Sequence, residues 1–299
     1  MDTKILSGKD VSNATYQSLQ SRIEALKSQS IVPGLAVLLI GEDAGSQIYV
    51  RNKTKKFADL GLYSNTFQYS SSISQEDLLS KIRELNNDDR FHGILVQLPL
   101  PKHIDKYKVL SAMDPKKDVD GFHPSNLGVL VAGKPHFIPC TPKGIMRILE
   151  HYQINLSGKN LVVVGRSNIV GRPISILTSL KKEYANATTT ICHSGTPDIV
   201  DHTKRADIVI LAIGSPNFLK GNHIKTGSVI IDVGINRVED HSPKGYKIVG
   251  DGDEMTLMGK ASAITPVPGG VGPMTIAMLI ENTIEACLLY TSPSPRDRG

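Results

Sequence analysis

The chain has 299 residues, of which 40% are hydrophobic and 21% charged, a balance that fits one large or two ordinary globular domains. Its net charge of +5 is modest, only 5% of its residues are aromatic and no apolar run is long enough to cross a bilayer, so nothing suggests a partner that is nucleic acid or membrane. The three cysteines lack the spacing of metal ligands or of a disulfide framework, so we expect no metal site. The N-terminus lacks a targeting pattern, so we expect a cytoplasmic location.

The first half of the chain alternates helical and strand patterns. Apolar positions spaced for a helix between Ser7 and Ser30 precede GLAVLLIG, which is typical of a buried strand. The predicted elements that follow are a helix from about Ala44 to Leu60, a strand Tyr63–Tyr69, a helix Gln75–Leu85 capped by Ser74, a strand Gly93–Leu98 and a helix from Pro142 to about His151.

A second α/β unit follows Ser157-Gly158-Lys159. Its predicted strands are Leu161–Val164, Thr188–Cys192, Asp207–Ala212 and Ser228–Val233, with helical patterns between the first pairs. A further apolar alternation at 261–264 and a helix pattern beginning at Pro273 close the series. The predicted fold class is therefore α/β, with two parallel-sheet domains.

Between the last strand pattern and the last helix lies TPVPGGVGPMT, from Thr265 to Thr275. So many prolines and glycines exclude a helix interior or a central strand, so this stretch must be a shaped loop. One interpretation is a long connector. The other is a ligand loop, favoured because strand-to-helix corners bind ligands in α/β proteins and because the glycines leave the backbone bare.

The strand LVVVG leads directly into a glycine-containing loop, Gly165 to Gly171, followed by a helix pattern. This GxSxxxG arrangement is a variant of the dinucleotide-binding loop, in which a helix N-terminus faces a phosphate. The next strand ends Ile-Cys-His-Ser with no carboxylate to hold ribose hydroxyls, and Arg166 with Ser194 could hold a 2′-phosphate, which favours NADP over NAD. The alternative is that Arg166 is a solvated loop residue and Ser194 a turn former.

A candidate acid/base group lies on the helix that begins near Ala44. Tyr49 and Lys53 are four residues apart and share a face, and Lys53 falls within the apolar arc of that helix. Desolvation would lower the pKa of such a lysine and leave neutral amine for proton transfer, whereas the alternative is a lysine whose stem runs along apolar surface to solvent. Gln97 ends a buried strand, where it could orient the lysine.

Two carboxylates occur in the sequence KDVDG, at Asp118 and Asp120. The plain interpretation is an Asp-Gly turn. The functional interpretation is a carboxylate that accepts hydrogen bonds from the amino group of a heterocycle.

Taken together, these segments resemble the bifunctional methylenetetrahydrofolate dehydrogenase/methenyltetrahydrofolate cyclohydrolase family. The resemblance extends over nearly all of 4–286. It rests on SQIYVRNKTK, GILVQLPLP, PKKDVDGFHPSNLG, PCTPKG, VVVGRSNIVGRP, ADIVILAIG, VIIDVGIN and ASAITPVPGGVGPMT, which occur in the family's order and approximate spacing. The run GDGDEMTLMGK departs from the family's GDVDF-like segment, so the resemblance leaves the packing between the last two strands open.

The resemblance implies a role for each matching residue. Lys53 would be the lysine of cyclohydrolase proton transfer, Tyr49 the tyrosine stacked near the folate and Gln97 the glutamine that tunes the lysine. The implied folate-binding residues are Asp120, which would bind the pterin, and Pro268, Gly269, Gly270 and Val271 of the closing loop. The implied cofactor-binding residues are Thr141, Gly165, Arg166, Ser167, Gly171, Ser194, Gly214 and Ile235.

The implied activity is oxidation of methylenetetrahydrofolate with NADP, then hydrolysis of the methenyl product to formyltetrahydrofolate, in the one-carbon metabolism that serves purine biosynthesis. The implied domains are a folate-binding catalytic domain over 1–145 and a Rossmann-type NADP-binding domain over 146–272, with a ligand cleft between them. A C-terminal helix over 273–286 would pack back on the first domain. The resemblance also suggests a cytoplasmic homodimer formed through the nucleotide domain.

Three alternatives to this function remain. One is an NAD-dependent monofunctional member of the same family, another a Rossmann dehydrogenase of the shikimate or amino-acid type, and the third a catalytically silent nucleotide-binding protein. For the C-terminus, CLLYTSPSPRD can be back-translated into a sequence that resembles a transposase-type sequencing adapter. We therefore expect residues 287–299 to be a non-native, disordered tail, with the natural chain continuing differently after Ala286.

Overall fold

A computed structural model describes residues 2–241 and 245–291, with side chains as far as Leu289. The chain forms two compact units. One consists of residues 16–140 with those from Met278 onward, and the other of residues 1–15 with 141–277. Because the divisions fall within the first and last long helices, α1 (Gly8–Ser28) and α10 (Val271–Thr291), each of these helices contributes residues to both units.

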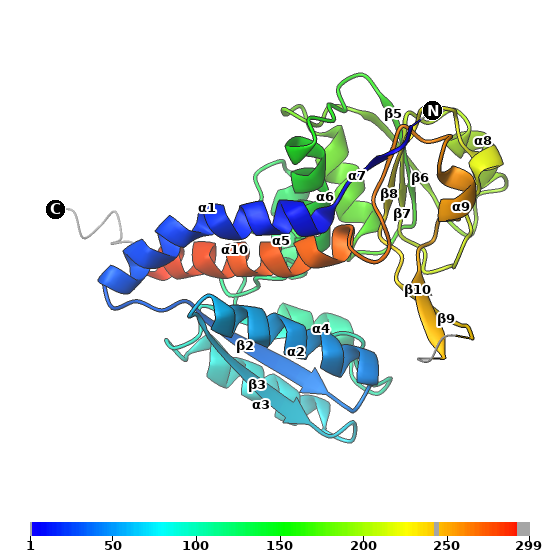
Figure 1. The fold of residues 1–299 in the computed structure, drawn as a ribbon. Coiled ribbons are helices and arrows are strands. Elements are labelled where there is room, and N and C mark those ends of the chain that lie inside the picture. The colour runs from blue at the N-terminus through cyan, green and yellow to red at the C-terminus, as the bar shows by residue number, and fades with distance from the viewer. Residues whose placement is uncertain (1, 242–244, 292–299) are drawn as a thin grey trace. The chain divides into compact units, whose positions relative to one another are not determined.

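The first unit, residues 16–140 with the end of α10, contains a three-stranded parallel sheet in the order β3-β2-β4. β2 (Gly34–Ile40) is central and every one of its residues is buried. Figure 1 shows α2 (Ala44–Asp59) along one face of this sheet and α3 (Gln75–Asn86) along the other. A strand covered on both faces has no solvent side, which explains its uninterrupted apolar sequence.

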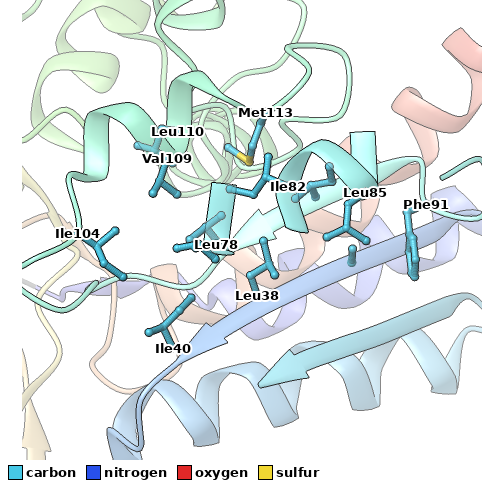
Figure 2. Close-up of a cluster of buried hydrophobic side chains, with 13 residues drawn as sticks. Leu38, Ile40, Leu78, Ile82, Leu85, Phe91, Ile104, Val109, Leu110 and Met113 are labelled. Carbon is cyan, nitrogen blue, oxygen red and sulfur yellow. The ribbon is translucent and has the colours of Figure 1, made fainter. Parts of the chain in front are cut away.

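The core of this unit lies between the sheet and α3 (Figure 2). Leu38 and Ile40 of β2 meet Leu78 and Ile82 of α3, and Met113 closes the cluster after the short helix α4 (Lys106–Ser111). The α3 residues recur every three or four positions, which places them on one helical face. This packing holds the carboxyl ends of β2 and β4 in place.

Several predicted elements of this unit are confirmed. β3 is Tyr63–Tyr69 as expected, β4 is the slightly shorter Gly93–Val96, and the side chain of Ser74 caps α3 by accepting a hydrogen bond from the Asp77 backbone N–H at 3.1 Å. The predicted helix at Pro142 begins two residues earlier, as α6 (Cys140–His151), and all of it except Cys140 belongs to the second unit. The short helix α5 (Pro124–Val131) was not predicted.

The second unit, residues 1–15 with 141–277, contains a parallel six-stranded sheet in the order β1-β11-β8-β7-β5-β6. From β5 the chain passes to β6 on one side and then returns to β7 on the other, so the strand order reverses beside β5. Ligands of doubly wound sheets bind at such a point. The strands are β1 (Lys4–Ile5), β5 (Asn160–Val164), β6 (Thr188–Cys192), β7 (Ile208–Leu211), β8 (Val229–Asp232) and β11 (Ala263–Ile264).

Short elements complete this unit. An antiparallel hairpin formed by β9 and β10 extends away from the six-stranded sheet (Figure 1). The hairpin and the short helix α9 were not predicted, because runs of four residues show no clear period. α8 lies between β6 and β7, where a helical pattern was expected. The elements are α7 (Gly171–Ser179), α8 (Ile199–Thr203), the 3-10 turn η1 (Gly221–His223), β9 (Asn236–Glu239), β10 (Tyr246–Val249) and α9 (Glu254–Leu257).

The expected first domain, residues 1–145, needs a correction at its N-terminal end. β1 pairs in parallel with β11 of the six-stranded sheet, and Leu6 N–H donates to the Ile264 carbonyl at 2.8 Å. Residues 1–15 therefore belong with the nucleotide-type sheet rather than with the three-stranded sheet. A two-residue strand leaves no sequence pattern, and its partner lies more than 250 residues away, so only the fold reveals the pairing.

The C-terminal helix also differs from the expected range of 273–286. α10 begins at Val271 and continues to Thr291, and Cys287 is fully buried. The expected disorder is therefore wrong for residues 287–291, because Cys287, Leu288 and Leu289 extend the apolar helix and the first helix-breaking proline comes later, at Pro293. The rest of the expected tail, 292–299, lies outside the described residues.

We expect Leu38→Ala to lower the free energy of unfolding by about 2–5 kcal/mol, because Leu38 is fully buried and its truncation leaves a cavity. Urea denaturation followed by circular dichroism measures the change. Val131→Ala, at a position 63% exposed in the same unit, should change it by less than about 0.5 kcal/mol. Equal effects of the two substitutions would contradict this core.

Candidate functional site

Lys53 is a buried lysine in the middle of α2. Its exposed fraction is 4%, and it lies on the same helical face as the buried residues Val50 and Phe57. Lys55, two residues on, is exposed. The alternative in which the Lys53 stem carries its ammonium to solvent is therefore wrong, and the amine is held inside the protein.

Two predicted partners surround the Lys53 amine. Nζ donates to Oε1 of Gln97 at 3.2 Å, and it lies 4.8 Å from the ring centroid of Tyr49, one helical turn earlier. Gln97 directly follows β4, and its Nε2 donates to the Leu98 carbonyl at 2.8 Å, which turns Oε1 toward the lysine. The structure thus brings together the three residues predicted to be catalytic.

Burial lowers the pKa of the Lys53 amine, because a charged ammonium loses hydration in this environment. The nearby Asp120 carboxylate and Cys140 sulfur act in the opposite direction, although burial is the larger effect. The result is an amine with a larger neutral fraction than a surface lysine has, next to a glutamine oxygen and an aromatic face. Such a group is better suited than a surface ammonium to accept and donate protons.

The two carboxylates of KDVDG have different tasks. Asp118 is fully buried, and its oxygens accept hydrogen bonds from Phe122 N–H at 3.1 Å, His123 N–H at 2.7 Å and Asn126 Nδ2 at 2.8 Å. Burial raises the pKa of Asp118, while these donors oppose the rise. Asp118 therefore shapes the loop, as the turn interpretation expected, and Asp120 is the carboxylate whose charge reaches Lys53.

The nucleotide loop follows β5, at the point where the strand order reverses. Gly165 has φ +131°, and a Cβ at Gly171 would overlap the Gly165 carbonyl, so both positions require glycine. Ser167 Oγ accepts from the N–H groups of Val170 at 3.1 Å and Gly171 at 3.4 Å, and the Ser167 carbonyl accepts from Arg172 N–H at 3.0 Å. These first N–H groups of α7 therefore already have acceptors in this structure, and the loop fits a dinucleotide by its glycines and its place after β5.

The other predicted cofactor residues also follow strands of this sheet. Arg166 follows β5, Ser194 follows β6, Gly214 follows β7 and Ile235 follows β8. All four are exposed. Because the carboxyl ends of parallel strands lie at one edge of a sheet, these four residues gather at the edge where the nucleotide loop begins.

The glycine- and proline-rich loop lines a cavity of ≈ 190 Å³. The loop contributes residues 266–273, which include Pro268, Gly269, Gly270 and Val271, and the opposite wall comes from residues 232–235 and Ile248. Thr141 lies beside this region, with its hydroxyl 3.0 Å from that of Thr275. The loop thus forms a wall of this cavity, to which Ile235 also belongs, and its role as a ligand loop stays a prediction.

Two buried carboxylates beside this cavity were not predicted from the sequence. Asp232 ends β8, and its oxygens accept from Gly234 N–H at 2.8 Å, Asp251 N–H at 3.0 Å and Gly252 N–H at 2.7 Å. Asp251 lies in the segment that departs from the family pattern. The available signal was the repeated pairing of Asp with Gly in DVG and GDGD, because a small residue lets a neighbouring carboxylate approach the backbone closely.

The described residues hold no cluster of His, Cys, Asp and Glu side chains able to bind a metal ion. No described helix is both long and apolar enough to cross a bilayer.

We expect the Asp232 carboxyl to titrate near pH 6, since burial and the neighbouring Asp251 raise its pKa to about 6 against the pull of three N–H donors. The native state then keeps this proton between roughly pH 4 and pH 6 while the unfolded chain loses it. In that interval this group alone makes the free energy of unfolding fall as the pH rises. Carbon-13 chemical shifts of the carboxyl measure the midpoint, and a midpoint near pH 4 would refute the expectation.

Two family models match most of the chain. Residues 6–120 match the catalytic domain of tetrahydrofolate dehydrogenase/cyclohydrolase, and residues 139–290 match the NAD(P)-binding domain of the same family.

Curated relatives and solved structures match along nearly the whole length. The bifunctional protein FolD of Chlorobium chlorochromatii is 52% identical over 286 residues, which cover 94% of this chain and 97% of the relative. The FolD of Acetivibrio thermocellus is 50% identical over 289 residues, covering 97% and 98%. The crystal structure of the bifunctional FolD methylenetetrahydrofolate dehydrogenase/cyclohydrolase from Campylobacter jejuni is 45% identical with a TM-score of 0.91, covering 96% of this chain and 99% of that one. The enzyme from Trypanosoma brucei, complexed with NADP cofactor and inhibitor, is 36% identical with a TM-score of 0.92, covering 98% and 100%.

Proposed function

The chain belongs to the tetrahydrofolate dehydrogenase/cyclohydrolase family, and from this premise we propose that it oxidises methylenetetrahydrofolate with NADP and then hydrolyses the methenyl product to formyltetrahydrofolate. The relatives that are about 50% identical are named bifunctional, so the comparisons do not favour a monofunctional or catalytically silent protein. The observation that carries the proposal is the buried Lys53 amine with Gln97 and Tyr49 around it.

For the hydrolytic step, Lys53 moves protons. Water adds to the methenyl carbon and loses a proton, and a ring nitrogen of the folate must gain one as the five-membered ring opens. An amine with a lowered pKa serves both transfers, and a cationic substrate beside it would lower that pKa further. Gln97 holds the amine by its Oε1, and the Tyr49 ring offers a face on which a folate can stack.

For the oxidation step, the protein supplies position rather than a nucleophile. NADP, when bound, accepts the hydride from the one-carbon bridge of the folate. The residues after β5 to β8 would hold the dinucleotide, with its phosphates at the start of α7. Asp120 would bind the pterin, and residues 268–271 would close over the folate.

The preference for NADP over NAD rests on the end of β6. Ser194 follows Cys192 and His193 there, with no carboxylate in the position that usually holds ribose hydroxyls. Arg166 is exposed at the start of the nucleotide loop and carries a guanidinium suited to a phosphate.

We expect Lys53→Met to lower cyclohydrolase turnover by roughly 10²–10⁴-fold, because the proton-transfer group is lost. A two-wavelength assay with methylenetetrahydrofolate follows NADPH and the methenyl product, which should accumulate in this variant and not in the wild type. Lys55→Met, which removes an exposed lysine from the same helix, is the matched control and should behave as wild type. Absence of methenyl accumulation in folded Lys53→Met would remove the lysine from the mechanism.

We expect Arg166→Ala to raise the KM for NADP by roughly tenfold or more while changing the KM for NAD little, because a charge-assisted hydrogen bond to the 2′-phosphate is worth about 1.5–3 kcal/mol. Steady-state kinetics with both cofactors measure the ratio. Arg205→Ala removes an exposed arginine that follows α8, just before β7 begins, and should leave the ratio unchanged. A wild type that prefers NAD would overturn the NADP assignment.

The remaining features of this function stay predictions: the individual roles of the site residues, the ligand cleft between domains, the homodimer and the cytoplasmic location.

A further inference from the structure

One carboxylate organises the loop that follows β7. Asp251 is fully buried, and its Oδ2 accepts from Ile213 N–H at 2.8 Å and Gly214 N–H at 3.1 Å, while Oδ1 accepts from Ser215 N–H at 2.9 Å. Oδ1 also accepts from Nδ2 of Asn236 at 2.9 Å. Four donors from two separate loops therefore converge on a single side chain.

Three successive backbone N–H groups form a concavity of the kind that binds anions. Here an internal carboxylate already occupies that concavity, so these N–H groups are not available to a phosphate of a bound dinucleotide. The loop after β7 therefore takes its shape from a contact inside the protein.

The backbone that carries Asp251 is itself fixed to the sheet. Asp232, the last residue of β8, accepts from the N–H groups of Asp251 and Gly252. The Asp251 carbonyl accepts from the Leu219 N–H at 3.0 Å. The Asp251 backbone is therefore held through both its N–H and its carbonyl. Its carboxylate thus provides a fixed position for the loops that it binds.

The same carboxylate connects two of the predicted cofactor residues. Gly214 donates to it directly, and Asn236, its side-chain donor, immediately follows Ile235. Ile235 lines the cavity beside the glycine- and proline-rich loop, and Gly214 is exposed at the same edge of the sheet. A shift of the Asp251 side chain would displace both residues together.

We propose that Asp251 is a positioning residue for the dinucleotide: it sets the loops of Gly214 and Ile235 in the arrangement that binds the cofactor, and it serves oxidation but not hydrolysis. This inference rests on the proposed function, since it takes the edge of the six-stranded sheet as the NADP site. The hydrolytic residues Lys53, Gln97 and Tyr49 belong to the other unit, so a defect confined to the nucleotide loops should separate the two activities.

The test is Asp251→Asn, which keeps the shape but replaces one acceptor oxygen with an NH₂ group that faces N–H donors. Three quantities are measured: the KM for NADP with its kcat, the Kd for NADP by calorimetry, and hydrolysis of methenyltetrahydrofolate supplied directly without nucleotide. We expect KM and Kd for NADP to rise at least tenfold, kcat to recover largely at saturating NADP, and direct hydrolysis to stay within twofold of wild type.

Asp253→Asn is the matched control, because Asp253 lies two residues away in the same segment and makes no side-chain capping bond to α9. It should leave all three quantities unchanged. Asn236→Ala is a milder second variant that removes one donor and should raise the KM for NADP severalfold with hydrolysis intact. If Asp251→Asn does not fold, as judged by the thermal transition of that variant, Asn236→Ala provides the test instead.

Equal losses of oxidation and hydrolysis in the folded variants, or an unchanged affinity for NADP, would overturn the inference. A wild type that hydrolyses the methenyl substrate but neither binds NADP nor reduces it would instead overturn the proposed oxidation, and the positioning role with it. The two failures are therefore distinguished by the wild-type measurement alone.

Discussion

The structure depends on one constraint: a charged group taken out of water must find partners inside the protein. Lys53, Asp118, Asp232 and Asp251 are all buried, and the three aspartates each accept at least three hydrogen bonds from donors placed around them. Because such donors are mostly backbone N–H groups, each carboxylate fixes the path of a loop. Lys53 differs, since its Nζ donates to an amide oxygen and lies over an aromatic face. The aspartates therefore build the scaffold, while the lysine keeps a lowered pKa that suits proton transfer.

The topology of each of the two sheets explains which site residues that sheet positions. In the six-stranded sheet the order reverses beside β5, and successive parallel strands deliver Arg166, Ser194, Gly214 and Ile235 to one edge. In the three-stranded sheet β2 is covered on both faces, and the residue after β4 is the glutamine that meets Lys53. Residues that follow strands thus supply most of the contacts, while Lys53 itself comes from the helix α2.

Much of the site could be predicted from the sequence because its signals are local. The period of α2 placed Lys53 on the apolar face, and the strand before Gly165 identified the nucleotide loop. The different tasks of Asp118 and Asp120 could not be predicted, because both lie in one five-residue run and only burial separates them. The role of Asp251 was likewise hidden, since its donors at 213–215 lie more than 35 residues away.

The sequence alone predicted the α/β class, the order of most strands and helices, the glycine loop and the place of Lys53 on the apolar face of its helix, since these depend on the spacing of neighbouring residues. Three features emerge only in the folded chain: β1 joins the six-stranded sheet, α10 continues to Thr291, and Asp251 binds the loop after β7. The reason is that a two-residue strand has no period, a helix continues where its apolar face stays covered, and a carboxylate finds its donors only after the chain has folded.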